Sequence, residues 1–184
     1  WRLEGEGAPD DRFDAVVIAV PAEQAAPLLA VHAPDFADDA RDVKSEPCWT
    51  AMVAFESRVD APDTLADEGA IGWAARNSAK PGRDADRECW VIQANPRWSR
   101  AQLEREAENV GEELLAHFAR AVGNLPPVLF SSAHRWRYAK SEKNDAGALW
   151  DDGLRIGVCG DWLSGPRVEN AFLSGLALAR RIAG

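Results

Sequence analysis

The order of apolar and polar residues predicts short strands and helices along the chain. Residues 1–20 have the pattern of a hairpin, because a polar, turn-rich stretch leads into an apolar run over 13–20. Pro21 then opens a predicted helix, since proline is favoured in a first helical turn, and Pro27 is expected to kink it. Further helical turns are predicted over 35–43. Other strands are predicted over 45–59, 70–75, 89–94, 128–140 and 154–158, with connections over 60–69, 80–87 and 145–153.

The clearest helix is predicted over residues 99–122. Ser99 is in position to cap it, and Gln102 stands three residues later, as a capping box requires. Gly123 ends the helix, and the prolines at 126 and 127 prevent it from continuing. Apolar residues recur every three or four positions and predict one buried stripe. The stripe consists of Leu103, Ala107, Val110, Leu114, Phe118 and Val122.

The predicted strand over 128–140 alternates in character. Its aromatic residues fall on one face and two arginines fall on the other. Such an aromatic face suits a flat substrate that stacks on it, although a plain aromatic core would produce the same pattern. The residues that we single out as candidate substrate contacts are Trp73, His134, Trp136 and Tyr138. Near the first of them, Arg76, Lys80 and Arg83 suit either a phosphate-bearing substrate or an exposed, charged loop.

The last 25 residues carry the most specific pattern. Gly160 and Asp161 close an apolar strand, a Gly165-Pro166 turn follows, and a helix is predicted over 167–182. A carboxylate at this point can accept hydrogen bonds from sugar or ribityl hydroxyls, and the free N–H groups of the first helical turn attract an electron-rich group. The sequence therefore predicts a dinucleotide site here. Small residues at Ala171, Gly175 and Ala179 predict close packing of this helix.

Composition and charge narrow the classes of function. The 184 residues suffice for one core, or one core plus a subdomain. A net charge of −9 disfavours nucleic acid and anionic membrane as partners, and no apolar run is long enough to span a bilayer. Cys48, Cys89 and Cys159 are too few and too scattered for a disulfide framework, so we expect buried free thiols in a cytoplasmic protein. The three histidines lack metal-ligand spacing, so no metal is expected.

The C-terminal segment resembles the flavin signature of the FAD-dependent amine oxidase family. Within that family, the sequence is most similar to the renalase-like bacterial group. The resemblance continues upstream through Phe13–Ala22, Trp73–Arg83, Trp90–Ala94 and Ala133–Ala139, in the family's order. It therefore spans nearly the whole chain.

The resemblance implies non-covalent FAD and assigns its contacts. An acidic residue at the place of Asp161 binds the FAD linker in the family, with capping of the turn as the alternative role here. The helix N-terminus faces the pyrimidine edge of the flavin. Arg167 either brings positive charge to the flavin or pairs with Glu169, and Asn170 stands where the family often has glycine. The implied cofactor-binding residues are Gly160, Asp161, Arg167, Val168, Glu169 and Ala171.

The resemblance also implies a discontinuous architecture. We expect an α+β fold with about four strands in a middle sheet. Residues 1–35 and 154–184 would belong to a Rossmann-like FAD-binding domain, and residues 36–153 would form the substrate-binding domain. The chain lacks the Gly-x-Gly-x-x-Gly pattern that begins such enzymes. We therefore interpret it as the C-terminal part of a longer protein whose N-terminal half completes the cofactor domain.

Two functions from different classes follow. In the first, the intact protein is an oxidoreductase that passes a hydride from a small molecule, either a dihydronicotinamide-type compound or an amine, to FAD and then to oxygen. No catalytic acid or base is assigned, because the flavin carries that chemistry. The 184-residue chain alone is expected to be inactive and to self-associate through apolar surface that its missing half would cover. In the second, the chain is a non-catalytic binding module.

Overall fold

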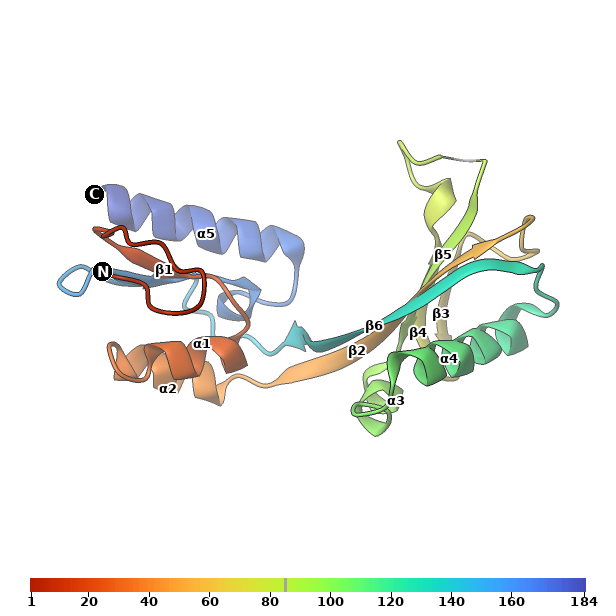
Figure 1. Ribbon diagram of the computed structural model, residues 1–184, viewed down its shortest axis with the longest axis horizontal. Coiled ribbons are helices and arrows are strands. Elements are labelled where there is room, and N and C mark those ends of the chain that lie inside the picture. Colours follow the sequence, from red (N-terminus) through yellow and green to blue (C-terminus); the bar gives the residue numbers. More distant parts are fainter. Residues whose placement is uncertain (85) are drawn as a thin grey trace. The chain divides into compact units, whose positions relative to one another are not determined.

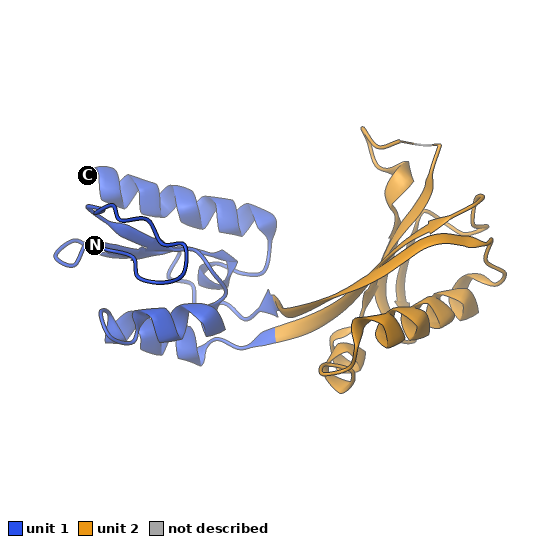
Figure 2. Ribbon diagram, in the orientation of Figure 1, with its two compact units in different colours: residues 1–45, 140–184 blue, residues 46–139 orange. Residues whose placement is uncertain are grey.

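The computed structural model of the protein describes residues 1–84 and 86–184, and it divides the chain into two compact units (Figure 2). The first unit combines residues 1–45 with residues 140–184, and the second consists of residues 46–139. Among the described residues, no helix has the length and apolar character needed to cross a bilayer. The assignment of 1–35 and 154–184 to a cofactor-binding domain stays a prediction.

The first unit is a three-layer arrangement around a small mixed sheet (Figure 1). Its sheet has the order β1-β8-β7, with β1 parallel to β8 and β7 antiparallel to it. One face packs on two alanine-rich helices, and α5 lies over the other face. The elements are β1 (Val16–Ile18), α1 (Ala22–Leu29), α2 (Pro34–Asp42), β7 (Leu149–Asp151), β8 (Ile156–Val158), the 3₁₀ turn η2 (Asp161–Leu163) and α5 (Val168–Ala183).

The close approach of α5 to the sheet depends on Gly157 in the middle of β8. A Cβ built at this position would lie 2.8 Å from Leu178 of α5 and 3.0 Å from the Trp150 ring. These distances are shorter than real carbon contacts, so only glycine allows the helix to approach this closely. Leu178 is buried at this contact.

The second unit is a five-stranded antiparallel sheet of order β3-β4-β5-β2-β6, covered on one face by α4. Its core joins alternate residues of β2, β4 and β5 to Val110, Leu114 and Phe118 of α4. The elements are β2 (Ser45–Phe55), β3 (Thr64–Glu68), β4 (Ile71–Arg76), the 3₁₀ turn η1 (Asn77–Ala79), β5 (Glu88–Ala94), α3 (Pro96–Ala101), α4 (Ala107–Val122) and β6 (Val128–Ser141).

The predicted α+β class is confirmed, while several element bounds are wrong. The single helix predicted over 99–122 is two helices, α3 and α4. Asn95, not Ser99, caps the first of them, because its side chain accepts the Trp98 N–H at 2.8 Å and Pro96 occupies the first turn. Ser99 is instead buried, and its hydroxyl accepts the Trp49 backbone N–H.

Two strands lie where connections were predicted. The 60–69 segment contains β3, which brings the middle sheet to five strands, and the 145–153 segment contains β7. Both are short and pair with a neighbour that follows closely along the chain. In the opposite sense, the strand predicted over 13–20 is reduced to three residues in β1.

Candidate functional site

The Gly160–Asp161 turn links the end of β8 to α5 by way of η2. Trp162 and Leu163 are fully buried and fix this turn in the core, and the Trp162 indole donates to the Val20 carbonyl. A Cβ at Gly160 would lie 2.9 Å from the Trp162 ring, so glycine is required there. The Gly160 N–H is bound by the Ser174 hydroxyl of α5 at 3.0 Å. The turn is therefore rigidly positioned.

Asp161 faces partly to solvent at this turn. Its backbone carbonyl accepts the Ser164 N–H at 2.9 Å, and its side chain is half-buried. Among the described residues, the carboxylate takes part in no hydrogen bond or ion pair, so the capping role is not observed for the side chain. A fixed carboxylate with free lone pairs suits hydroxyl donors such as those of a ribityl chain.

The N-terminus of α5 is held by Asn170. The Asn170 side chain donates to the carbonyls of Ser164 and Gly165, at 3.3 and 3.1 Å, and so closes the Gly-Pro turn. Gly165 has a φ of +122°, which only glycine adopts readily. Asn170 thus has a local structural task, which explains an amide at this position. Arg167 and Glu169 are exposed, and no ion pair between them is present in the described part of the chain.

One side of α5 exposes apolar residues. Val168, Phe172 and Leu176, spaced four residues apart, are 90%, 68% and 37% exposed. Ala171 and Ala179 are also exposed, and Gly175 has no atom within 4 Å of a built Cβ. The expected close packing through these three small residues is therefore wrong for this chain, where the helix packs through its Ser174 and Leu178 side. The small and apolar residues together form an unpartnered surface.

The aromatic candidates are on the face of the five-stranded sheet opposite α4. Ala133 and Arg135 of β6 point to the α4 side, where the Arg135 guanidinium lies 5.8 Å from the Trp49 ring centre. By alternation, His134 and Trp136 point to the other side. They form an edge-to-face pair with centroids 4.5 Å apart, and Trp136 is 55% exposed. Neither is a core residue, and Tyr138 is half-buried.

Trp73 lies on the same face as His134 and Trp136, although not beside them. It belongs to β4, and β5 and β2 separate β4 from β6. Its register partner is Gln93, and Gln93 is in turn opposite Thr50. The next cross-strand row contains Ala75, Val91 and Met52. Trp73 and Met52 are 44% and 41% exposed.

None of the paired residues on this face carries a charge, and we call it the uncharged face. It consists of Trp73 and Ala75 from β4, Cys89, Val91 and Gln93 from β5, Thr50, Met52 and Ala54 from β2, and His134 and Trp136 from β6. Sequence analysis missed most of these residues. The period-2 alternation of β2 and β5 was visible, but the pairing that aligns them is not encoded locally.

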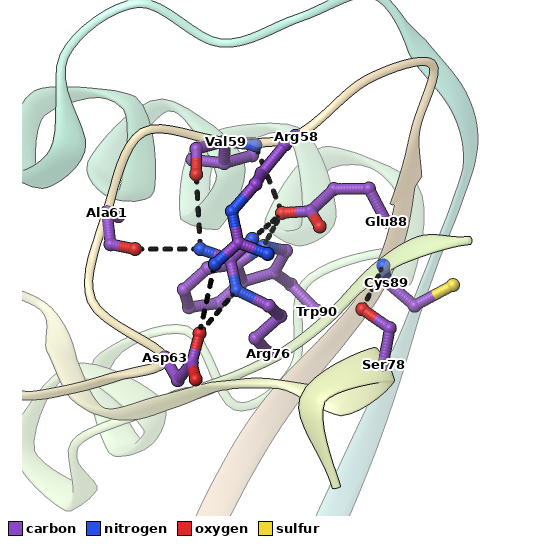
Figure 3. A network of polar contacts seen from close by, with 9 residues as sticks. All are labelled: Arg58, Val59, Ala61, Asp63, Arg76, Ser78, Glu88, Cys89 and Trp90. Atoms are coloured by element: carbon purple, nitrogen blue, oxygen red, sulfur yellow. Dashed lines mark hydrogen bonds and ion pairs between the residues drawn. The ribbon is translucent and has the colours of Figure 1, made fainter. Parts of the chain in front are cut away.

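Charged side chains gather on the opposite side, around Arg76 (Figure 3). Arg76 is 2% exposed. Its guanidinium donates to Asp63 at 2.7 Å, to the carbonyls of Val59 and Ala61, and to Glu88. The Trp90 ring lies beneath it at 4.7 Å. Both interpretations of Arg76, as a phosphate ligand or as exposed loop charge, are therefore wrong, while Lys80 and Arg83 are exposed.

Three free cysteines and scattered possible metal-ligating side chains lie among the described residues. The three cysteines are free, Cys159 is buried, and Cys48 and Cys89 are half-buried. Burial raises the pKa of Cys48, against a smaller opposing effect of its hydrogen bond with Thr50, and burial also raises the pKa of Cys159. Burial therefore disfavours the thiolate form of both side chains. Within residues 1–84 and 86–184, no group of three His, Cys, Asp or Glu side chains gathers as metal ligands would.

No family model matches the sequence, whereas several solved structures share its fold. A protein proposed to be a protoporphyrinogen oxidase from Exiguobacterium sp. 255-15 superposes with a TM-score of 0.71 at 11% identity, over 92% of this chain and 41% of that one. Cyclohexylamine oxidase from Brevibacterium oxydans IH-35A superposes with a TM-score of 0.71 at 14% identity, over 92% of this chain and 42% of that one. An oxidoreductase from Methanosarcina mazei superposes with a TM-score of 0.61 at 13% identity, over 92% of this chain and 43% of that one.

These comparisons show the fold of the chain. It spans about two fifths of the length of each of the three structures. All three are described as oxidases or oxidoreductases, and the likeness covers both compact units, since it includes 92% of the present chain.

Proposed function

We propose that the intact protein is an FAD-dependent oxidoreductase related to the amine oxidases, and within them to the renalase-like group. The observation that carries this proposal is the fixed turn with the free carboxylate of Asp161, next to the N-terminus of α5. The fold that the chain shares with cyclohexylamine oxidase supports it. The resemblance of residues 160–171 to the flavin signature of the family also supports it.

The residues around the turn fit a flavin dinucleotide. Asp161 would accept hydrogen bonds from the ribityl hydroxyls, and the N–H groups of Val168 and Glu169 would face the electron-rich edge of the ring. Gly160 packs against the Trp162 ring and so fixes the turn, and Ala171 presents no bulky side chain. Arg167 is exposed and would add positive charge near the flavin, which is negative when reduced.

FAD, when bound, takes a hydride from the substrate and passes both electrons to oxygen. The protein's part is to hold and orient a small flat molecule, for which the uncharged face supplies Trp73, His134 and Trp136, with Tyr138 half-buried on the same strand. We favour a dihydronicotinamide-type substrate over an amine, because the motifs of the sequence resemble those of the renalase-like group.

The unpartnered side of α5 supports a larger cofactor domain. Val168, Phe172 and Leu176 expose apolar surface that a further part of the protein would cover. The matched structures are more than twice as long as this chain, which leaves ample room for such a part.

Anaerobic reduction of the flavin tests the proposed reaction. The natural-length protein, purified with its flavin, is mixed with a dihydronicotinamide nucleotide or with benzylamine, and the visible flavin absorbance is followed. We expect rapid bleaching by the dihydronicotinamide and slow or no bleaching by the amine. Faster bleaching by the amine would make an amine the substrate class. Bleaching by neither compound would contradict the oxidoreductase proposal.

A further inference from the structure

We infer that the cavity between α3, α4 and the turn from β3 to β4 binds a small organic anion, namely a single carboxylate carried on a flat ring. We call it the α3 cavity. It has a volume of about 410 Å³, in the range of small-molecule pockets, and it is lined by Gly69 and Ala70 of the turn, by Asn95, by three residues of α3 and by His117 of α4. The inference does not rest on the proposed function, because the lining belongs to the second unit and shares no residue with the uncharged face.

The hydrogen-bond acceptors that line the α3 cavity are already engaged within the protein. The Asn95 backbone N–H donates to the Ala70 carbonyl at 2.9 Å, and its side-chain amide donates to the Gly69 carbonyl at 2.8 Å. The side-chain oxygen of Asn95 accepts the Trp98 backbone N–H at 2.8 Å. A ligand that offers donors therefore gains less from this wall than a ligand that offers acceptors.

The side-chain donors of the α3 cavity, by contrast, lack partners in the described part of the chain. The Arg97 guanidinium is exposed and forms no hydrogen bond or ion pair there. The Trp98 indole N–H also has no partner, and it is open to solvent, because the one fully buried polar side-chain atom without a partner in the described residues is Ser141 Oγ. No carboxylate is among the described lining residues, although the protein carries a net charge of −9.

His117 adds a third donor because of its contact with Arg120. Nη1 of Arg120 lies 3.3 Å from Nδ1 of His117. A guanidinium can only donate, so Nδ1 accepts, and the neutral imidazole carries its hydrogen on Nε2. The His117 ring meets the Trp98 ring edge to face, with centroids 5.9 Å apart. The two rings therefore bring their N–H donors to one wall of the cavity, beside Arg97.

A single carboxylate fits this set of donors better than a phosphate does. Arg97 is the one permanently charged side chain among the described lining residues, and a guanidinium can hold both oxygens of a carboxylate. The exposed Asp67 and Glu68 precede Gly69 in the chain, and their negative charges disfavour a doubly charged ligand. The half-buried Trp98 ring supplies the aromatic surface on which a flat ring can pack.

A titration of the 184-residue chain with three small probes tests this inference. The probes are benzoate, benzamide, which has nearly the same shape without the charge, and inorganic phosphate. Binding is followed by proton–nitrogen NMR of the indole groups. We expect benzoate to shift the Trp98 signal saturably, to leave the Trp73 signal unchanged, and to bind at least about tenfold more tightly than benzamide, because hydrogen bonds to a charged acceptor are stronger. Phosphate should bind more weakly than benzoate.

Four variants separate recognition from folding. Arg97→Gln should weaken benzoate about tenfold while changing benzamide less than about twofold, because only the charged ligand loses its counter-charge. His117→Phe keeps a ring but removes the third donor, and it should weaken benzoate severalfold. Arg97→Glu should strengthen the binding of benzylamine, which carries an ammonium group, and a misfolded protein cannot produce such a gain. Arg100→Gln is the matched control, because Arg100 is exposed on the same helix, pairs with Glu46 and does not line the cavity.

Equal binding of benzoate and benzamide to the wild-type chain would overturn the inference, as would the lack of saturable benzoate binding. Tighter binding of phosphate than of benzoate, or equal losses in Arg97→Gln and Arg100→Gln, would also overturn it. The titration contains no flavin, so its outcome is independent of the proposed oxidoreductase reaction.

Discussion

In the five-stranded sheet of the second unit, uncharged side chains and a network of paired charges lie on opposite faces. The uncharged face presents Trp73, Gln93 and Met52, while Arg76 and Glu88 are buried on the α4 side with their charges paired. Glu88 also accepts the Val59 N–H and the Trp90 indole N–H, so one carboxylate serves three donors. Such a network fixes the loop between β2 and β3, and it should be sensitive to the loss of any charged member.

Replacement of Arg76 by methionine should cost about 3–5 kcal/mol of unfolding free energy, because it leaves the buried Glu88 without its counter-charge. Denaturant unfolding measures this directly. The double variant Arg76→Met/Glu88→Gln should recover part of the loss, since glutamine still accepts both N–H groups. Arg58→Met is the control. Arg58 is exposed and its contact with Asp63 is long, at 3.6 Å, so this substitution should cost less than about 1 kcal/mol. Equal costs at Arg76 and Arg58 would contradict the network.

Glu104 gives a pH dependence of known sign. Its hydrogen bond from Arg137, with the charges of Arg137 and Arg135, lowers its pKa below the ordinary value of 4.5. A carboxylate whose pKa is lowered in the native state stabilises the fold at pH values above its pKa in the unfolded state, and this stabilisation is lost as pH falls. The unfolding free energy of the wild type should therefore decrease more steeply below about pH 4.5 than that of Glu104→Gln. If the wild type and Glu104→Gln lose stability equally with falling pH, or if Glu112→Gln has the same effect as Glu104→Gln, the pH dependence does not come from Glu104.

At the scale of elements, packing contacts decide how α5 meets its sheet. Gly157 and Gly175 lie on facing elements and offer a matched pair of substitutions. Gly157→Ala should destabilise by about 1–3 kcal/mol, because the new Cβ meets Leu178 at 2.8 Å. Gly175→Ala should stabilise by about 0.5–1 kcal/mol, because it adds helix propensity in open space. Thermal unfolding of both variants checks the opposite signs, and a loss at both positions would contradict this packing.

The elements also show how far the sequence could predict this fold. The buried stripe of α4 and the long strand β6 follow from periodicity that the local sequence carries. The start of α3 was signalled by Asn95-Pro96, a cap followed by a first-turn proline, but the capping-box pattern at Ser99 competed with it. The β3 strand is short and mostly exposed, so its identity comes from pairing with β4 and not from its composition.

The candidate site was predictable to a lesser extent. The aromatic positions of β6 could be assigned to one face from alternation alone. The row that Gln93 forms on the uncharged face could not be predicted, because its neighbours Trp73 and Thr50 are 20 and 43 residues away along the chain and meet it only through register. Equally, the burial of Arg76 depends on Asp63 and Glu88, which are distant in sequence.

For the whole molecule, the exposed apolar side of α5 predicts self-association of the 184-residue chain. Phe172 is 68% exposed and Val168 is 90% exposed on the same helix side. Sedimentation across a range of protein concentrations should show association, and Phe172→Ser should reduce it. Val31→Ser is the control, because Val31 is 82% exposed on a different segment. Association that persists unchanged in Phe172→Ser, or a chain that is monomeric throughout, would contradict a docking role for this surface.

The most direct test of the account is a titration of FAD into the 184-residue chain, followed by flavin fluorescence. Wild-type protein is compared with Asp161→Ala and with Asp152→Ala, in which an exposed carboxylate is lost. The account predicts saturable binding that weakens about tenfold or more in Asp161→Ala, since hydrogen bonds to a carboxylate are strong, and that is unchanged in Asp152→Ala. No saturable binding, or equal binding by all three proteins, would contradict the assignment of the Gly160–Ala171 turn to the flavin.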